Sequence, residues 1–148
     1  IYSSIKKLGG GVHLDLIHEP DFICYLFGLP LKKRVFKKKI SNLEINSVDY
    51  SNILFEYETF IVSIVLNYFR RDKKRSIEIV MKDETIYIDF EKNEIRNITT
   101  KKIIFKDKNN SIEDSYKKQL LYFINCLENN KTPMNDITEA KSILKLIL

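Results

Sequence analysis

The apolar residues of this chain change their spacing twice, and this change constrains the fold more than any other feature. From Gly11 to Gly28 they recur at intervals of three and four residues, as on one side of a helix. From Ser47 to Phe105 the period is two, and the short connections predict antiparallel neighbours. Helical spacing returns after Ser111. Strands and helices segregated in this order favour an α+β domain.

The middle of the chain predicts a mainly antiparallel open sheet of about five to six strands. The segment 59–69 is apolar on both faces, which is typical of a central strand. Helices are expected on one face only, which leaves the other face available for dimerisation. The expected strands, the first and last of them as edges, are 31–40, 47–57, 59–69, 77–81, 86–90 and 101–105.

Capping residues predict where the helices begin and end. Pro20 interrupts the first helical pattern and predicts a kink or two short helices around Ile17 to Asp21. Ser111 is expected to cap the next helix. Asp136, followed three residues later by Glu139, predicts a capping box at the start of the last helix.

Length and composition narrow the class of protein. A chain of 148 residues has room for a single domain over 1–148, and two distant cysteines offer no disulfide framework. No apolar run approaches the roughly 18 residues of a membrane span and no secretory leader is visible, so a cytoplasmic location is expected. The net charge of +5 comes with basic clusters, but aromatic residues are not interleaved with them. We therefore expect neither nucleic acid nor membrane as a partner.

The residues with acid–base chemistry gather between Gly9 and Asp21. On a helix, Asp15 and His18 share a face, and a carboxylate beside an imidazole suits proton transfer near neutral pH. The run Gly9-Gly10-Gly11 would let a ligand approach the backbone closely. Two other interpretations remain open, a hydrogen-bonded core histidine and a metal site built from His13, Asp15 and His18.

The segment Leu8–Gly28 resembles the start of the C-terminal domain of the Gfo/Idh/MocA oxidoreductases. The shared features are a glycine run, then Asp15, His18 and Asp21 on a helix that ends in an aromatic-Leu-x-Gly sequence. Further segments resemble the strands and closing helices of that domain, namely 44–57, 64–71, 75–80, 85–90, 116–130 and 135–140.

The resemblance implies one half of a two-domain enzyme. A missing N-terminal Rossmann domain would bind NAD or NADP and carry the catalytic lysine, so that no cofactor-binding residue and no metal is expected in this fragment, which alone would be inactive. The substrate would be a sugar or nucleotide sugar, and the sheet face would form a homodimer or homotetramer.

The resemblance also implies roles for particular residues. His18 would exchange the proton of the sugar hydroxyl, and Asp15 would orient the sugar or the histidine as the second catalytic residue. Expected substrate contacts are His13, Asp21, Tyr68 and Arg70. The alternative is a non-catalytic dimerising domain in which the His-Asp helix is only structural.

Overall fold

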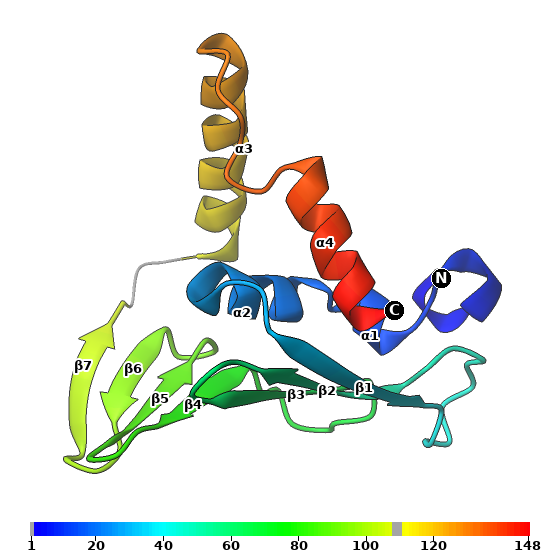
Figure 1. The fold of residues 1–148 in the computed structure, drawn as a ribbon, viewed down its shortest axis with the longest axis horizontal. Helices are drawn as coiled ribbons and strands as arrows, with labels where there is room; N and C mark the ends of the chain where they lie inside the picture. Colours follow the sequence, from blue (N-terminus) through cyan, green and yellow to red (C-terminus); the bar gives the residue numbers. More distant parts are fainter. Residues whose placement is uncertain (1, 108–110) are drawn as a thin grey trace. The chain divides into compact units, whose positions relative to one another are not determined.

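The computed structural model describes residues 2–107 and 111–148, which form two compact units (Figure 1). Unit 1 combines Ile1–Arg70 with Met134–Leu148, and unit 2 is Arg71–Pro133. Helices and antiparallel strands make up both units, which confirms the predicted α+β class. The single domain over residues 1–148 stays a prediction.

Unit 1 is built on a three-stranded antiparallel sheet in the order β1-β2-β3. The segment 59–69 was expected to be a central strand, but β3 lies at an edge and β2 is central. The elements of this unit are η1 (Tyr2–Ser4), η2 (Lys6–Leu8), α1 (Val12–Asp15), α2 (His18–Phe27), β1 (Lys32–Lys38), β2 (Tyr50–Glu56), β3 (Ile61–Asn67) and α4 (Ile137–Ile147).

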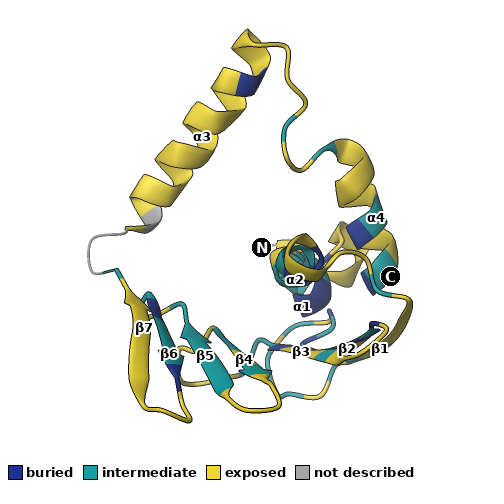
Figure 2. Cartoon of the chain, turned by 60° about the vertical axis from the view of Figure 1, so that its left-hand side comes forward, coloured by how far each residue is buried: buried dark blue, intermediate teal, exposed yellow. Residues whose placement is uncertain are grey.

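The core of unit 1 lies between this sheet and its helices. Ile53 and Phe55 alternate along β2 and are completely buried. Helices α1, α2 and α4 lie on one side of the sheet (Figures 1 and 2), which confirms helices on one face of β1–β3. They contribute the buried side chains of Val12, Ile23, Cys24, Ile143 and Ile147. The opposite face of the sheet exposes Phe36, Leu54, Ile61 and Val65.

The helical pattern of 11–28 is divided into two helices, as Pro20 predicts. The first helix ends at Asp15, and α2 begins at His18. Pro20 is the third residue of α2, within the first turn, where backbone N–H groups have no partner inside the helix. The missing N–H of proline therefore costs no helical hydrogen bond there. The break leaves Asp15 and His18 on two different helices.

Helix α4 is anchored at both ends. Asp136 and Glu139 form the predicted capping box, with the carboxylate of Asp136 accepting from Thr138 N at 2.8 Å and Glu139 N at 2.9 Å. At the other end, Lys37 Nζ donates to the carbonyls of Ile147 and Leu148 at 3.1 and 3.0 Å. Lysine side chains of β1 thereby satisfy carbonyls that a helix terminus leaves without partners.

A buried carboxylate fixes the connection between β1 and β2. Asp49 is fully buried and accepts hydrogen bonds from Ile40 N at 2.8 Å and Ser41 N at 3.0 Å, with Lys39 Nζ at 3.2 Å. Burial opposes ionisation of Asp49, but the hydrogen bonds from Ser41 and Ile40 outweigh it and lower its pKa to about 2. Asp49 is therefore an ionised anchor of the loop.

Unit 2 contains a second antiparallel sheet, in the order β4-β5-β6-β7. The described residues thus hold two sheets of three and four strands, where a single sheet of about five or six was expected. Strand β6 was missed because it has only four residues, two of them charged. The elements are β4 (Ser76–Val80), β5 (Thr85–Asp89), β6 (Glu94–Asn97), β7 (Lys102–Lys106) and α3 (Ile112–Glu128).

Helix α3 begins as its sequence predicts, with the Ser111 hydroxyl accepting from Asp114 N at 3.0 Å. Its described side chains are exposed apart from Cys126 (Figure 2). Across residues 2–107 and 111–148, no helix has the length and apolar character required to cross a bilayer.

Candidate active site

The glycine run before α1 packs against the chain itself. A Cβ on Gly10 would lie only 2.5 Å from the carbonyl oxygen of Ser3 and 2.6 Å from that of Tyr2. Gly11 has a φ of 137°, a backbone angle that residues other than glycine rarely adopt. These two glycines therefore let the η1 turn lie directly against the start of α1, and Tyr2 is positioned by this contact.

The expectation that a ligand would approach the glycine backbone is wrong for two N–H groups of the run and for that of Val12, which follows it. Gly9 N donates to Lys6 O at 3.1 Å, Gly10 N to Ile5 O at 3.0 Å, and Val12 N to Val48 O at 2.8 Å. The run also follows a short helix rather than a strand. It therefore does not form the open cradle that a dinucleotide pyrophosphate needs, and we derive no step through a cofactor on this chain.

Asp15 receives hydrogen bonds from two tyrosines. Tyr2 donates its hydroxyl proton to Oδ1 at 2.9 Å, and Tyr68 donates to Oδ2 at 3.2 Å. Burial and the Asp15 carboxylate raise the pKa of Tyr68, and the hydrogen bond to Asp15 raises that of Tyr2. Both phenols therefore stay protonated near neutral pH and keep donating to the carboxylate.

Tyr2 is a member of this group that the sequence analysis did not predict. It lies in η1, thirteen residues before Asp15, and its contact depends on the close packing of Gly10. Tyr68, by contrast, was among the predicted site residues, and its position follows from β3, which ends one residue earlier.

His18 is the exposed histidine, and its nearest described partner is Glu19. The imidazole Nε2 lies 3.2 Å from Glu19 Oε1, and 54% of the side chain is accessible. Among the described hydrogen bonds and ion pairs, none joins His18 to Asp15, whose two oxygens accept from Tyr2 and Tyr68. His18 therefore presents an imidazole at the start of α2, with a carboxylate beside it.

Asp21 connects α2 to the segment before α4. Its Oδ2 accepts from Asn135 Nδ2 at 3.0 Å. Burial and the negative charge of Glu139 raise the pKa of Asp21, while His18 acts in the opposite direction. Asp21 and His18 are thus close enough to influence each other electrostatically.

His13 is directed into the core. It is 6% exposed, and its Nδ1 has no hydrogen-bond partner within the described residues. Burial, aided by the positive charge of Lys37, lowers its pKa from 6.5 to about 4, so the imidazole is neutral at neutral pH. The structure thereby separates His13 from Asp15, and its role as a substrate contact stays a prediction.

Arg70 lies just beyond β3 on the surface. Its backbone N donates to Asn67 Oδ1 at 2.9 Å.

The proposed metal alternative finds no support in residues 2–107 and 111–148, where no three His, Cys, Asp or Glu side chains converge as a metal site requires. The candidate site therefore consists of Asp15 with its two tyrosines and of His18 with Glu19 and Asp21.

Comparison with known proteins found similarity at the level of structure. No family model and no curated protein matches the sequence. A UDP-N-acetylglucosamine 3-dehydrogenase (GnnA) from Acidithiobacillus ferrooxidans has a TM-score of 0.70 at 17% identity, over 90% of this chain and 44% of that one. A dehydrogenase (MviM) from Clostridium difficile gives a TM-score of 0.70 at 18% identity, over the same shares.

A third similar structure contains bound ligands. The WlbA dehydrogenase from Bordetella pertussis, solved with NADH and UDP-GlcNAcA, has a TM-score of 0.63 at 18% identity, over 93% of this chain and 44% of that one. The chain thus spans less than half the length of these proteins. The chain shares its fold with the matched part of these dehydrogenases, and this agrees with the α+β fold that the resemblance of Leu8–Gly28 implies.

Proposed function

We propose that this chain is the substrate-binding and oligomerisation domain of an NAD(P)-dependent dehydrogenase acting on a sugar or nucleotide sugar. The observation that carries the proposal is the break between α1 and α2, which holds a hydrogen-bonded carboxylate, Asp15, three residues before an accessible imidazole, His18. NAD or NADP supplies hydride transfer and is bound by a separate Rossmann domain.

In this proposal His18 exchanges the proton of the substrate hydroxyl. Its imidazole is accessible, and the carboxylate of Glu19 lies 3.2 Å from Nε2. Asp15 supplies a carboxylate that orients substrate hydroxyls, and Asp21, which lies in electrostatic reach of His18, is a further substrate contact. Tyr2 and Tyr68 fix the rotamer of Asp15, and Tyr68 and Arg70 extend the polar surface for the rest of the substrate.

The open face of β1–β3 supports the oligomerisation part of the proposal. Phe36, Asn52 and Val65 form one row across the three strands, on the side opposite the buried core. Phe36 is 56% and Val65 54% exposed. A second copy of the same face would cover these apolar side chains by a two-fold interface.

The test uses the full-length protein with its cofactor domain. NAD reduction is measured with UDP-N-acetylglucosamine and other sugar substrates for wild type, for His18→Gln and for the control Tyr25→Phe on the exposed side of α2. We expect His18→Gln to lower kcat about a hundredfold or more and Tyr25→Phe to change it less than about twofold. The isolated chain should show no turnover.

A different result would support the alternative function. If His18→Gln retains kcat within about threefold, the histidine is not the acid–base group, and a non-catalytic dimerising domain becomes the better account. Circular dichroism of each variant separates loss of chemistry from loss of folding.

A further inference from the structure

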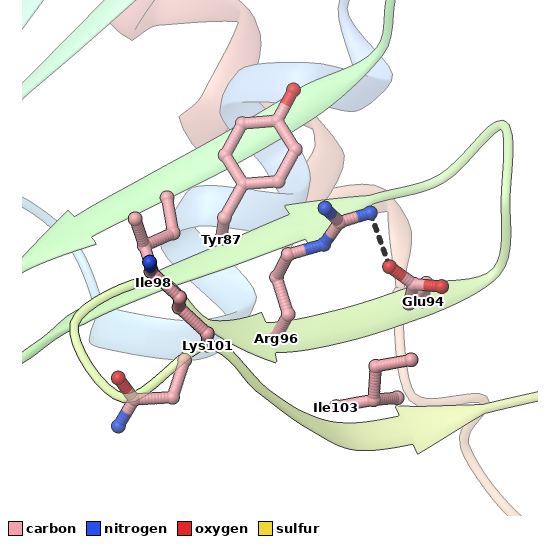
Figure 3. Close-up of a pocket in the computed structure, with 7 residues that line it drawn as sticks. Tyr87, Glu94, Arg96, Ile98, Lys101 and Ile103 are labelled. Atoms are coloured by element: carbon pink, nitrogen blue, oxygen red, sulfur yellow. Dashed lines mark ion pairs between the residues drawn. The ribbon is translucent and has the colours of Figure 1, made fainter.

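Unit 2 contains an open pocket on its four-stranded sheet, in a different compact unit from the candidate active site. It encloses about 580 Å³ and is lined from β5, β6, β7 and the β6–β7 turn (Figure 3). Its lining residues are Tyr87, Glu94, Arg96, Asn97, Ile98, Lys101 and Ile103. The pocket therefore combines two cations, one carboxylate and apolar walls.

The carboxylate in this pocket is already neutralised by the protein. Glu94 is 4% exposed, pairs with Arg96 through one oxygen, and accepts from Lys106 Nζ through the other at 2.6 Å. The hydrogen bond from Lys106, with a smaller contribution from Arg96, keeps the pKa of Glu94 below its usual range. Glu94 thus acts as a fixed anion that orients the arginine rather than as a group seeking a ligand.

The arginine retains donors for a further acceptor. Only one terminal nitrogen of Arg96 engages Glu94, and Nε has no hydrogen-bond partner within the described residues. Figure 3 shows the second terminal nitrogen turned toward Tyr87, away from Glu94. Because Nε is buried, the donors that remain available to a ligand are those of this second terminal nitrogen.

The backbone conformation of the β6–β7 region positions Arg96 and Lys101 at the pocket. The β6–β7 register shifts between Ile95 and Arg96, and such bulges re-aim side chains. Lys101 has a left-handed φ of 60°, which is rare for a residue other than glycine. The turn that holds it brings a second cation to the rim of the pocket. Asn97 donates its amide to Glu84, and because this donor is neutral, Glu84 keeps its negative charge beside the pocket.

We propose that this pocket binds the oxyanion group of a small organic molecule, with Arg96 and Lys101 as its donors. With Lys106 counted, three cations stand against the two carboxylates of Glu94 and Glu84, so a negative group gains a net attraction there. Tyr87, Ile98 and Ile103 supply apolar surface for the carbon skeleton of the ligand. An anion with an apolar or ring portion is therefore favoured over a bare ion.

The test is an NMR titration of the chain with benzoate, phenyl phosphate, acetate and inorganic phosphate at constant ionic strength. We expect saturable shifts of the amides of residues 87 and 96–103, with a Kd of about 1–10 mM for the ring-bearing anions and at least about fivefold weaker binding of acetate and inorganic phosphate. The stronger of benzoate and phenyl phosphate identifies the preferred oxyanion.

Three variants separate binding from folding. Arg96→Lys keeps a cation for Glu94 but removes the planar fork, and Lys101→Gln changes an exposed rim residue; each should weaken benzoate binding about fivefold or more. Lys82→Gln, an exposed lysine of the β4–β5 turn, should change it less than about twofold. Absence of saturable shifts, or equal binding by Lys101→Gln and Lys82→Gln, would overturn the proposal.

Discussion

The Tyr68 hydroxyl donates to Oδ2 of Asp15 at 3.2 Å and ties the end of β3 to the break between α1 and α2. Tyr68→Phe removes this donor and leaves half of a partly buried carboxylate without its partner. We expect a loss of about 1 kcal/mol in the free energy of unfolding and, in the full-length enzyme, roughly a tenfold lower kcat/KM. Urea unfolding and steady-state kinetics measure both. Tyr25→Phe, at an exposed position, should leave both unchanged.

Substitution of Asp49 should lower the free energy of unfolding more than substitution of any other carboxylate residue of unit 1. Asp49→Asn removes an ionised acceptor that is completely buried and hydrogen-bonded to Ile40 and Ser41, so we expect a loss of about 3 kcal/mol in the free energy of unfolding. The exposed control Asp83→Asn should cost less than about 0.5 kcal/mol. Equal effects in urea unfolding would contradict the role of Asp49 as an anchor.

The same residue predicts an acid dependence. Because the pKa of Asp49 falls from 3.8 to about 2 on folding, the unfolded state binds the proton more readily. Its stabilising contribution is complete above about pH 4 and disappears as the pH falls through 2. Unfolding free energies measured between pH 4 and pH 2, the range of that loss, should fall less steeply in Asp49→Asn than in wild type.

His13 predicts a separate dependence at higher pH. Burial lowers its folded pKa from 6.5 to about 4, so between these values the unfolded state carries the extra proton. Stability should therefore be complete above pH 6.5 and should decrease as the pH falls toward 4. His13→Gln should reduce the change of unfolding free energy with pH by an amount that corresponds to the uptake of up to about one proton on unfolding. The control Tyr25→Phe, at an exposed position of α2, leaves both histidines in place and should keep the slope of wild type.

The open sheet face predicts an effect on assembly. Val65→Lys places a charge among the exposed apolar residues of β1–β3 and should weaken self-association at least about tenfold. Sedimentation velocity across a concentration series measures this change. Val80→Lys alters an even more exposed valine in unit 2, 74% against 54% for Val65, and should leave the association constant as in wild type. A parallel loss in both variants would place the interface elsewhere.

Local sequence signals predicted where helices and strands occur better than they predicted which strands pair in the sheets. Pro20 indicated the α1–α2 break, and Asp136 with Glu139 indicated the start of α4, because both act through neighbouring residues. The edge position of β3 was not predictable in this way. Its apolar residues on both faces match a central strand, whereas strand order depends on contacts distant in sequence.

In the candidate site, too, residue chemistry could be predicted from the sequence, whereas contacts between distant residues could not. Asp15, His18 and Tyr68 have side chains whose chemistry is visible in the sequence. Tyr2 was missed because its contact with Asp15 depends on close packing at Gly10, where a Cβ would lie only 2.5–2.6 Å from the η1 carbonyls. Likewise, the buried position of His13 depends on its side of α1, and a helix of four residues gives too short a pattern to reveal it.

The contacts between Lys37 and the end of α4 have a consequence for how the polypeptide folds during synthesis. Lys37 must meet Ile147 and Leu148, from which it is separated by 110 and 111 positions in the sequence. All of unit 2, Arg71–Pro133, lies between them along the chain. The ribosome therefore releases the sheet β1–β3 long before Ile143 and Ile147 arrive to cover its core. Until then the nascent chain exposes an apolar surface suited to chaperone binding, and closure of this core is a late, long-range step.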